Sequence, residues 1–564
     1  MRFGLRCRVL GLVALVATGL LGLGPTPISE ASAAVPYAAQ EIAWRPCFEP
    51  SQLPSGLPSG AEALECGSFR VPRDWTAPGA GVDLTIAVSR LGPRGSAARG
   101  SLFTNPGGPG GAGRQLPLVL LTRARARVLA DLEVVGIDVR GTGASTNVTC
   151  GNRTSTGDNL DPRDRRPENT DLILDAARFV AKSCQSASPD LSRFITTAQT
   201  VHDLDLLRQL LGRERINWLG YSGGTWLGAY YATYFPERVG RFVLDANAEF
   251  TAPWQRVFDN QPLGFQRRFR VDFLPYVAAY HAYFGLGATP EDVNRTYEGL
   301  RAELAAAPVA LDKTLVVYPS DLDGLFVSAM YSKRRFQSAA EDFRTLRDAA
   351  ANRGMSADGR AQAWRQRLAD DVRRNREFHP FGGPLPLAPD APPETFQSIV
   401  CNDTPWPGDR ISLLADSERL GAAYPLTGWE TLSAPCVFWS RPAAELPTPT
   451  GVGVPPVLMV QTERDPATPI EGAVRAHERF AGSRLLTVVD EGDHGSYAVG
   501  RNDCVDDTVE AYLLDGVLPA VGATCPGTPI PPPVLVIDPF RLPGSDPVDV
   551  ISKPINRVVR RVGR

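Results

Sequence analysis

This 564-residue sequence has no large excess of positive or negative charge, few long apolar runs and only five histidines. The 59 lysines and arginines nearly balance the 62 aspartates and glutamates, which leaves a net charge of −3. A nucleic-acid-binding protein needs a basic face, so we exclude nucleic acid as a partner. Beyond residue 24 no apolar run approaches the ~20 residues that cross a bilayer, so we expect no stable membrane insertion of the mature chain.

The N-terminal segment has the three parts of a secretory signal peptide. Three arginines lie within the first eight residues, residues 9–24 are apolar, and the small residues of 31–33 permit cleavage after Ala33. The alternative is a membrane anchor, but an apolar run that ends before Pro25 is short for that role. We therefore predict a signal peptide over 1–33 and a secreted, extracellular protein.

Eight of the nine cysteines lie beyond the signal peptide and form four couples that are local in sequence. An even number of cysteines in an exported protein indicates disulfides, although sequence alone leaves many pairings open. No C-x-x-C occurs, and no histidine stands at ligand spacing from these cysteines, so we expect no metal site. Pairing between neighbours, the scheme that we favour, joins Cys47–Cys66, Cys150–Cys184, Cys401–Cys436 and Cys504–Cys525.

Strand and helix patterns alternate along most of the chain. Residues 64–71 and 82–91 are typical of an antiparallel pair, and Thr197 is the predicted N-cap of a helix with apolar residues at helical spacing. This alternation is typical of an α/β protein whose mostly parallel central sheet is covered by helices on both faces. Further strands are predicted at 101–104, 132–139, 216–219, 239–244, 457–461 and 485–489, and further helices at 225–234 and 473–480.

The alternation is interrupted between residues 250 and 398, where the chain is helical, amphipathic and rich in arginine and aromatic residues. We predict an inserted helical cap there, between two parts of one core at 34–249 and 399–525. A proline-rich tail follows at 526–564 and is rich in arginine at its end. It is either a surface wrap, the simpler expectation, or a segment that associates with the cell wall.

Gly220-Tyr221-Ser222-Gly223-Gly224 is a G-x-S-x-G motif between a predicted strand and a predicted helix. A nucleophilic serine at this position needs small neighbours, because the strand-to-helix turn is sharp and strained. The following helix directs its positive N-terminus at the reacting centre. An ordinary tight turn is the alternative, but this context predicts Ser222 as the nucleophile of an α/β-hydrolase fold.

The nucleophile needs a base, and in this fold the order along the chain is Ser, then Asp or Glu, then His. Among only five histidines, His494 lies in a glycine-flanked loop directly after the last predicted strand, where ligands collect in open α/β sheets. The other four are less suitable: His202 precedes the serine, His281 and His379 lie in the predicted cap, and His477 lies inside a predicted helix.

The acid that orients His494 should follow an earlier strand. Asp465 lies just past residues 457–461, in a turn fixed by prolines, and we predict it as the third member of the triad. Two alternatives remain: Glu463 in the same turn, and Asp245 at the end of the preceding strand of the sheet.

The oxyanion formed during acyl transfer needs two backbone N–H groups. Gly223 is predicted to supply one, and the glycine-rich loop at Gly107 and Gly108 the other. Residues 108–113 also spell G-x-G-x-x-G, with Glu133 downstream, which is the fingerprint of a dinucleotide site. Because a proline and five glycines suit an exposed loop better than a helix start, we prefer the oxyanion interpretation.

Five motifs occur in one order along the chain: NPGGPG at 105–110, DVRGTG at 138–143, the Ser222 turn, DPATP at 465–469 and GDHG at 492–495. With these motifs the chain resembles the secreted tripeptidyl aminopeptidases, relatives of the prolyl aminopeptidases among the α/β-hydrolases. The resemblance covers nearly the whole mature chain. It implies serine exopeptidase chemistry on peptide substrates through Ser222, His494 and Asp465, without a metal or organic cofactor.

Two positions depart from the prolyl aminopeptidase pattern. Pro106 stands where those enzymes usually have histidine, and Gly223 stands where they have tryptophan or tyrosine. The second departure leaves more room beside Ser222, which argues against a strict preference for proline.

The triad alone does not choose a substrate, because the pocket does. An exported esterase or lipase-like enzyme is the main alternative, and a catalytically inactive binding protein is a third. An aminopeptidase needs a buried carboxylate to hold the substrate ammonium, since an unpaired charge in a dry pocket is costly. Asp403, beside Cys401, and Glu249, at the entry to the cap, are the candidates, although either also fits a solvated surface acid.

Overall fold

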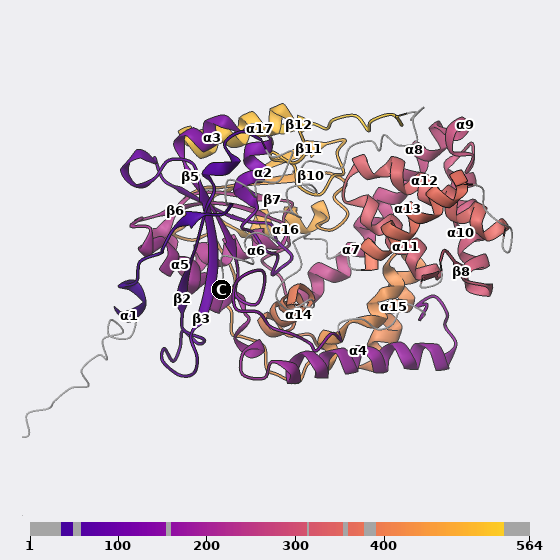
Figure 1. The fold of residues 1–564 in the computed structure, drawn as a ribbon, viewed down its shortest axis with the longest axis horizontal. Coiled ribbons are helices and arrows are strands. Elements are labelled where there is room, and N and C mark those ends of the chain that lie inside the picture. The colour runs from indigo at the N-terminus through magenta and orange to yellow at the C-terminus, as the bar shows by residue number, and fades with distance from the viewer. Residues whose placement is uncertain are drawn as a thin grey trace, which may run out of the picture.

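The computed structural model describes residues 35–48, 58–123, 125–153, 160–312, 315–352, 359–376 and 391–534. The predicted signal peptide, His379 and most of the proline-rich tail lie outside these residues. A twisted sheet with helices on both faces forms one part of the molecule, and a lobe of further helices lies beside it (Figure 1).

A ten-stranded sheet runs in the order β1-β2-β3-β5-β4-β6-β7-β10-β11-β12. Strands β1, β2, β3 and β5 pair antiparallel, and the remaining neighbours pair parallel. All the predicted strands are confirmed, whereas β1 and β12 have only two and three residues, too few for a sequence pattern. The bounds are β1 Arg45–Pro46, β2 Glu65–Val71, β3 Leu84–Leu91, β4 Ser101–Asn105, β5 Glu133–Asp138, β6 Ile216–Tyr221, β7 Val239–Asp245, β10 Val457–Thr462, β11 Ser483–Val489 and β12 Thr524–Pro526.

Helices cover both faces of the parallel part. On one face α5 (Thr197–Leu210), α6 (Gly223–Tyr234) and α16 (Ile470–Arg479) pack in one hydrophobic cluster, together with the short N-terminal α1 (Val35–Ala38). On the other face α2 (Leu116–Thr122), α3 (Ala126–Asp131) and α17 (Asp503–Glu510) pack in another. Every residue of β4, β5 and β10 is buried, as expected for parallel strands covered on both sides.

The predicted N-cap of α5 is wrong by one residue. The cap is Thr196, which has extended backbone and whose hydroxyl accepts the N–H of Gln199 at 3.2 Å. Thr197 is the first helical residue, and both its N–H and its hydroxyl donate to Asp403. Thr196 and Thr197 fit the cap position equally well from sequence. In the structure Thr197 is bound to Asp403, and Thr196 is the cap.

The helical lobe lies between residues 254 and 376, and its described residues form most of a second hydrophobic cluster, which Leu426 and Ala467 join from outside the lobe. It follows β7, and the sheet resumes with β10, which pairs in register with β7 although residues 246–456 intervene. A small antiparallel pair, β8 (Val309–Ala310) with β9 (Val316–Val317), is the exception to its helical character. Its helices are α7 Trp254–Arg268, α8 Leu274–Ala279, α9 His281–Phe284, α10 Pro290–Ala306, α11 Pro319–Met330, α12 Phe336–Ala351 and α13 Gly359–Arg376, with a π-helical turn at Phe269–Phe273.

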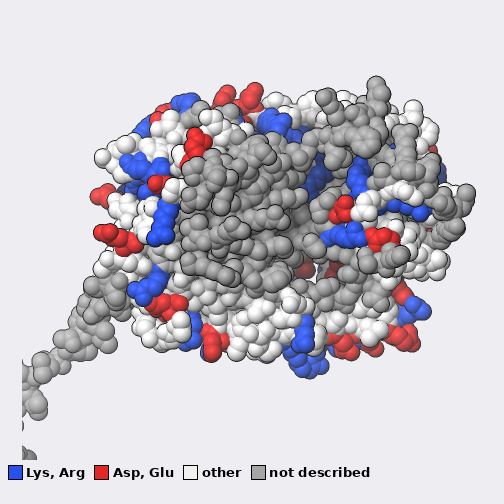
Figure 2. All heavy atoms as spheres, viewed as in Figure 1, with Lys and Arg blue, Asp and Glu red and all other residues white. Residues whose placement is uncertain are grey.

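Three further helices connect the two parts. In Figure 1 the long α4 (Pro167–Ala187) lies along the lower edge, beneath α14 (Ala391–Asp403) and α15 (Arg410–Ala423). Charged side chains of both signs are interspersed over the visible described surface (Figure 2). Ion pairs also join these helices: Arg410 on α15 pairs with Asp171 and Asp175 on α4 at 2.7 and 2.6 Å.

The last described residues lie against the lobe. The N–H and carbonyl of Val534 both bond the Gln337 side chain, and Ile530 packs on the lobe's hydrophobic cluster. Residues 527–534 therefore follow the surface-wrap interpretation. None of the described helices is long and apolar enough to span a membrane.

The four predicted disulfides are confirmed: Cys47–Cys66, Cys150–Cys184, Cys401–Cys436 and Cys504–Cys525. The last joins α17 to β12, and the third joins α14 to the 3₁₀ turn at Pro435–Phe438.

Replacing both Cys504 and Cys525 with alanine should lower the free energy of unfolding by about 3 kcal/mol, because the disulfide restricts a loop of ~20 residues in the unfolded chain. Urea unfolding of the purified enzyme, with the Cys150/Cys184 double variant for comparison, measures the loss. Peptide mapping without reductant should recover all four pairs in the wild type. Free thiols there would contradict the pairing.

Candidate active site

Ser222 occupies the sharp turn between β6 and α6. Its φ and ψ angles are 54° and −123°, a strained conformation for a residue with a side chain. The flanking glycines are required: a Cβ on Gly220 would lie 2.3 Å from the Gly224 carbonyl oxygen, and one on Gly224 would lie 2.8 Å from the Asn105 carbonyl oxygen. The turn therefore has the geometry that presents a nucleophilic serine at the carboxyl edge of a parallel sheet.

The glycine-rich loop after β4 lies directly over this turn. A Cβ on Gly107 would be 2.3 Å from the Tyr221 carbonyl oxygen, and one on Gly223 would be 2.8 Å from the Pro109 nitrogen. The Gly107 N–H donates to the Asn105 side chain at 2.9 Å, so the structure does not support Gly107 as an oxyanion donor. Gly223 begins α6, where an N–H has no intrahelical acceptor. Gly108 and Gly223 are the better-placed candidates.

His494 and Asp465 are in direct contact. Both carboxylate oxygens of Asp465 lie 2.9 Å from Nδ1 of His494. The same carboxylate accepts the N–H groups of Ala467 and Thr468 at 2.9 and 2.8 Å, so its own turn holds it in place. The Thr468 hydroxyl lies 3.4 Å from the same ring nitrogen. Nε2 of His494 is buried and has no hydrogen-bond partner within the described residues, which leaves it for a reacting group.

The two alternative acids have other partners. Glu463 is half exposed and accepts the N–H of Asp490 at 2.8 Å. Asp245 accepts the N–H groups of Ser496 and Tyr497, with distances of 2.9 and 2.7 Å to one oxygen. Neither therefore has the contact with the imidazole that Asp465 makes.

Asp245 instead ties the histidine loop to the nucleophile. Its backbone carbonyl accepts the Ser222 N–H at 2.9 Å, while its side chain holds the two residues that follow Gly495. The Tyr221 hydroxyl adds a bond of 3.0 Å to the Tyr497 carbonyl. Complete burial raises the pKa of Asp245 to about 7, against the opposing effect of the two N–H donors. These contacts place Ser222 and His494 at the same end of the sheet.

The other three histidines of the described residues lie on helices, away from the Asp465 carboxylate. His202 packs among the rings of Trp75, Tyr234 and Phe235, and burial lowers its pKa. His477 lies on α16 and bonds the Ser483 hydroxyl at 2.8 Å, and His281 begins α9.

Neither predicted ammonium anchor is supported by its contacts. Asp403 is buried, accepts two hydrogen bonds from Thr197 at 2.8 and 2.6 Å, and lies 3.4 Å from the indole nitrogen of Trp254. Burial raises its pKa to about 6 in spite of these donors. Glu249 is buried and paired with Arg475 at 2.6 Å and Arg256 at 3.3 Å. One carboxylate therefore holds the start of α5, and the other is neutralised by two arginines.

The dinucleotide interpretation is also unsupported. Glu133 begins β5, beside the first residue of β4, and forms ion pairs with Arg90 and Arg213. The glycine loop follows the other end of β4, about 13 Å away at the rise of a β-strand. Among the described residues, one group has metal-ligand spacing (Cys150, Cys184 and Glu394), but its two sulfurs are joined in a disulfide.

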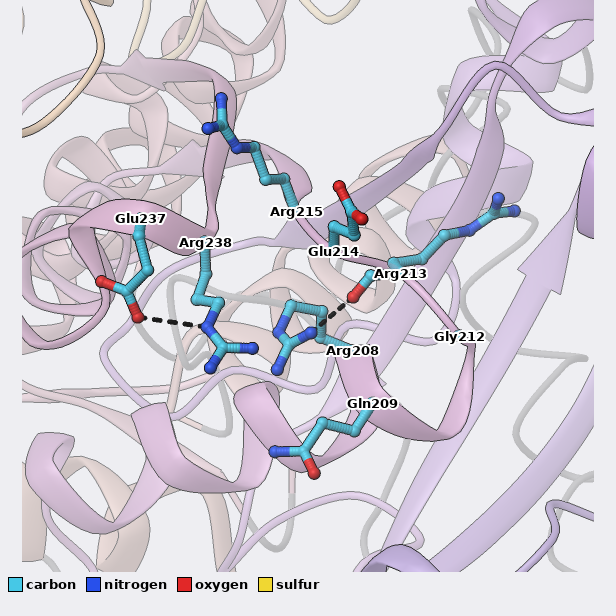
Figure 3. Close-up of a pocket in the computed structure, with 8 residues that line it drawn as sticks. All are labelled: Arg208, Gln209, Gly212, Arg213, Glu214, Arg215, Glu237 and Arg238. Atoms are coloured by element: carbon cyan, nitrogen blue, oxygen red, sulfur yellow. Dashed lines mark hydrogen bonds and ion pairs between the residues drawn. The ribbon is translucent and has the colours of Figure 1, made fainter.

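A hollow of about 650 Å³ lies elsewhere, at the amino end of β6 (Figure 3). Three of its four arginines have internal partners: Arg208 pairs with Asp205, Arg213 with Glu133, and Arg238 with Glu237. Because a nucleophilic turn forms at the carboxyl end of its strand, this hollow is separate from the Ser222 site.

Several supporting residues were missed as such by sequence reasoning. Asp138 accepts the N–H groups of Gly113, Arg114 and Ala144 and pairs with the Arg114 side chain, so it joins the glycine loop to the next turn. Arg140 is fully buried and pairs with Asp203 on α5 at 2.6 Å. Both stand in the DVRGTG motif, which was the available signal, but their partners come from distant segments.

Comparisons with known proteins agree with this geometry. Residues 424–525 match the family described as TAP-like protein. A tripeptidyl aminopeptidase of Streptomyces coelicolor is 33% identical over 88% of each chain. The serine protease Hip1 of Mycobacterium tuberculosis is 28% identical over 91% of this chain and 96% of its own, and a carboxylesterase B of the same species is 29% identical over 93% and 96%.

Replacing Ser222 with alanine should lower kcat by about 10⁴–10⁶-fold, because only binding and the oxyanion donors remain to assist the reaction. A fluorophosphonate probe should label the wild type and not the variant. Labelling of the variant at full intensity would exclude Ser222 as the nucleophile.

Replacing Asp465 with asparagine should lower kcat by about 10⁴-fold, because the amide no longer holds the imidazole in the required tautomer. The matched control is Glu463→Gln in the same turn, which should keep kcat within about twofold, since an exposed acid bonded to backbone contributes little. Steady-state kinetics at neutral pH compares the two variants. An equal loss of kcat in the two variants would contradict the assignment of Asp465, rather than Glu463, as the acid that orients His494.

Proposed function

Because this chain belongs to the tripeptidyl aminopeptidase family of α/β-hydrolases, we propose that it is an exported serine exopeptidase that releases short peptides, chiefly tripeptides, from free N-termini. The contact between Asp465 and His494, in a loop tied to the Ser222 turn, is the observation that carries the proposal. The four disulfides support an extracellular place of action, because such bonds persist in oxidising compartments.

The proposed reaction follows the acyl-enzyme course. Ser222 attacks the scissile carbonyl carbon while His494 takes the hydroxyl proton through Nε2. The N–H groups of Gly108 and Gly223 stabilise the oxyanion, and Asp465 stabilises the imidazolium. His494 then gives the proton to the leaving amine. In the second half of the reaction water attacks the acyl-enzyme, His494 takes the proton of the water and returns it to Ser222, and the peptide is released.

A second candidate is ester hydrolysis by the same triad. One observation favours testing it: the relative named carboxylesterase B covers 93% of this chain. Ester and peptide bonds pass through similar tetrahedral intermediates, so the triad serves both, and a requirement for a free amino group separates them.

An ammonium anchor is therefore the feature that the proposal requires. We propose Asp259 on α7 and Glu430 in the 3₁₀ turn at Gly428–Ser433 in place of the two carboxylates above. Burial raises the pKa of Asp259 to about 6, with Asp416 adding to the shift, and burial raises that of Glu430 to about 7. The Glu430 side chain nevertheless keeps solvent access. A substrate ammonium would supply the positive charge that such a carboxylate needs.

Acetylating the N-terminus of a good tripeptide substrate should lower kcat/KM roughly 30- to several-thousand-fold, which corresponds to about 2–5 kcal/mol of lost binding energy, because the anchoring carboxylate loses its partner. Fluorogenic mono-, di- and tripeptides, each with free and acetylated N-termini, are compared with simple esters. Equal cleavage of free and blocked peptides would replace the exopeptidase proposal with an endopeptidase or an esterase.

If Glu430 or Asp259 is the anchor, its amide variant should raise KM for free tripeptides at least tenfold and leave cleavage of acetylated peptides unchanged. Asp175→Asn on the exposed face of α4 serves as the control. The measurement is KM for each peptide pair. An equal change for free and acetylated peptides would exclude that residue.

A further inference from the structure

The segment that precedes the catalytic histidine is bound by the helical lobe. Asp493 accepts hydrogen bonds from the Arg268 guanidinium at 2.5 Å, the Lys333 N–H at 2.7 Å and the Ser332 hydroxyl at 3.1 Å. Lys333 also extends its ammonium to Glu491 at 2.5 Å. The histidine itself is included, because its N–H donates to the Tyr331 carbonyl at 3.0 Å.

Arg268 stands at the centre of these contacts. It ends α7, is 1% exposed, and lies over the ring of Phe336 at 5.0 Å. A Cβ on Gly492 would lie 2.0 Å from the Arg268 guanidinium, so only glycine permits this approach. Gly492, the first glycine of the GDHG motif, thus leaves room for a lobe arginine beside the loop that carries His494.

The contacts continue to the acid of the triad. Arg268 pairs with Asp272 at 2.5 Å, and Asp272 pairs with Arg464, the residue before Asp465, at 3.1 Å. The Arg464 N–H donates to the Glu491 carbonyl at 2.8 Å. Lobe helix α7 also touches this turn directly, since a Cβ on Gly264 would lie 2.4 Å from the Pro466 carbonyl oxygen.

Three positive and three negative side chains therefore form one largely buried network, with exposed fractions of 17% or less. Within a dry network each charge depends on its partners, because removing one leaves the other uncompensated. The members of this network are Arg268, Asp272, Lys333, Arg464, Glu491 and Asp493.

We propose that Arg268 and Lys333 of the lobe are positioning residues of the catalytic site, and that they hold the His494 and Asp465 loops in their reactive arrangement. The lobe is then part of the catalytic apparatus. This inference rests on the proposed function only in taking His494 and Asp465 as the base and the acid. A displacement of about 1 Å in such groups costs on the order of 10²-fold in rate.

The test uses Arg268→Gln, with Arg267→Gln as the matched control. Arg267 is the adjacent residue of α7, and it pairs with the partly exposed Glu471 outside the network. In the intact enzyme Arg268→Gln should lower the rate of fluorophosphonate labelling and kcat by about 10²-fold, with KM within twofold of the wild type. Arg268→Lys should restore part of the rate, since it keeps the charge and loses the two-pronged geometry. Arg267→Gln should leave all three quantities unchanged.

The pH profile separates positioning from simple loss of folded protein. Charges near His494 come from the network and from Asp465 and Asp245. Arg335 acts on Tyr331, whose ring packs edge-on against His494. Removing a positive charge by Arg268→Gln should move the acid limb of kcat/KM to higher pH, and removing a negative charge by Asp493→Asn should move it to lower pH. Loss of folded protein lowers the amplitude and leaves the limb in place.

If Arg268→Gln does not fold, the labelling rate, kcat and the pH profile are measured on Arg464→Gln instead, because Arg464 is the most exposed member of the network. Full labelling rates in the folded variants, or limbs that do not move, would overturn the proposal. Absence of labelling in the wild type would instead refute the assignment of Ser222, so the two failures are distinguishable.

Discussion

The hydrogen bonds between Asp465 and the His494 imidazole are the interaction on which the described arrangement depends. They join the turn after β10 to the loop after β11, and each of these segments is held independently: the first by the Ala467 and Thr468 N–H groups, the second by Asp245. An imidazole must meet its acid and its nucleophile at opposite nitrogens. The sheet satisfies this requirement by ending β6, β7, β10 and β11 at one edge.

Positive and negative charges are nearly balanced over the whole chain, but individual ion pairs differ in how much they contribute to the structure. Exposed pairs such as Arg410 with Asp175 contribute little to stability. The buried pairs lie at junctions: Arg140 with Asp203 joins a motif loop to α5, and the charged network joins the lobe to the triad loops. Arginine predominates at these junctions because its planar, permanently charged group can bond several acceptors at once.

Local patterns were sufficient for most of the core and for the contact between Asp465 and His494. The strands were predictable because parallel strands are continuous apolar runs, and the sharp turn at Ser222 was predictable because its glycines are required sterically. The disulfides followed the order of the cysteines. Roles that depend on a distant partner were not predictable: Glu249 is neutralised by Arg475, far along the chain, and Asp403 binds Thr197 from another helix. The long α4 lies where the sequence pattern predicts no helix. The contacts of Asp403 and Glu249 do not support them as anchors, and sequence does not display those partners.

The insertion of the lobe between β7 and β10 has a consequence for the order of folding. The Ser222 turn arises from neighbouring segments, whereas β10 must find β7 across residues 246–456. Contacts of such long separation form late, because a large loop has to close first. Asp465 and His494 lie beyond this gap, so a partly folded chain would contain the proposed nucleophile without its proposed base. Hydrolytic activity is therefore expected to begin only when the whole chain is assembled.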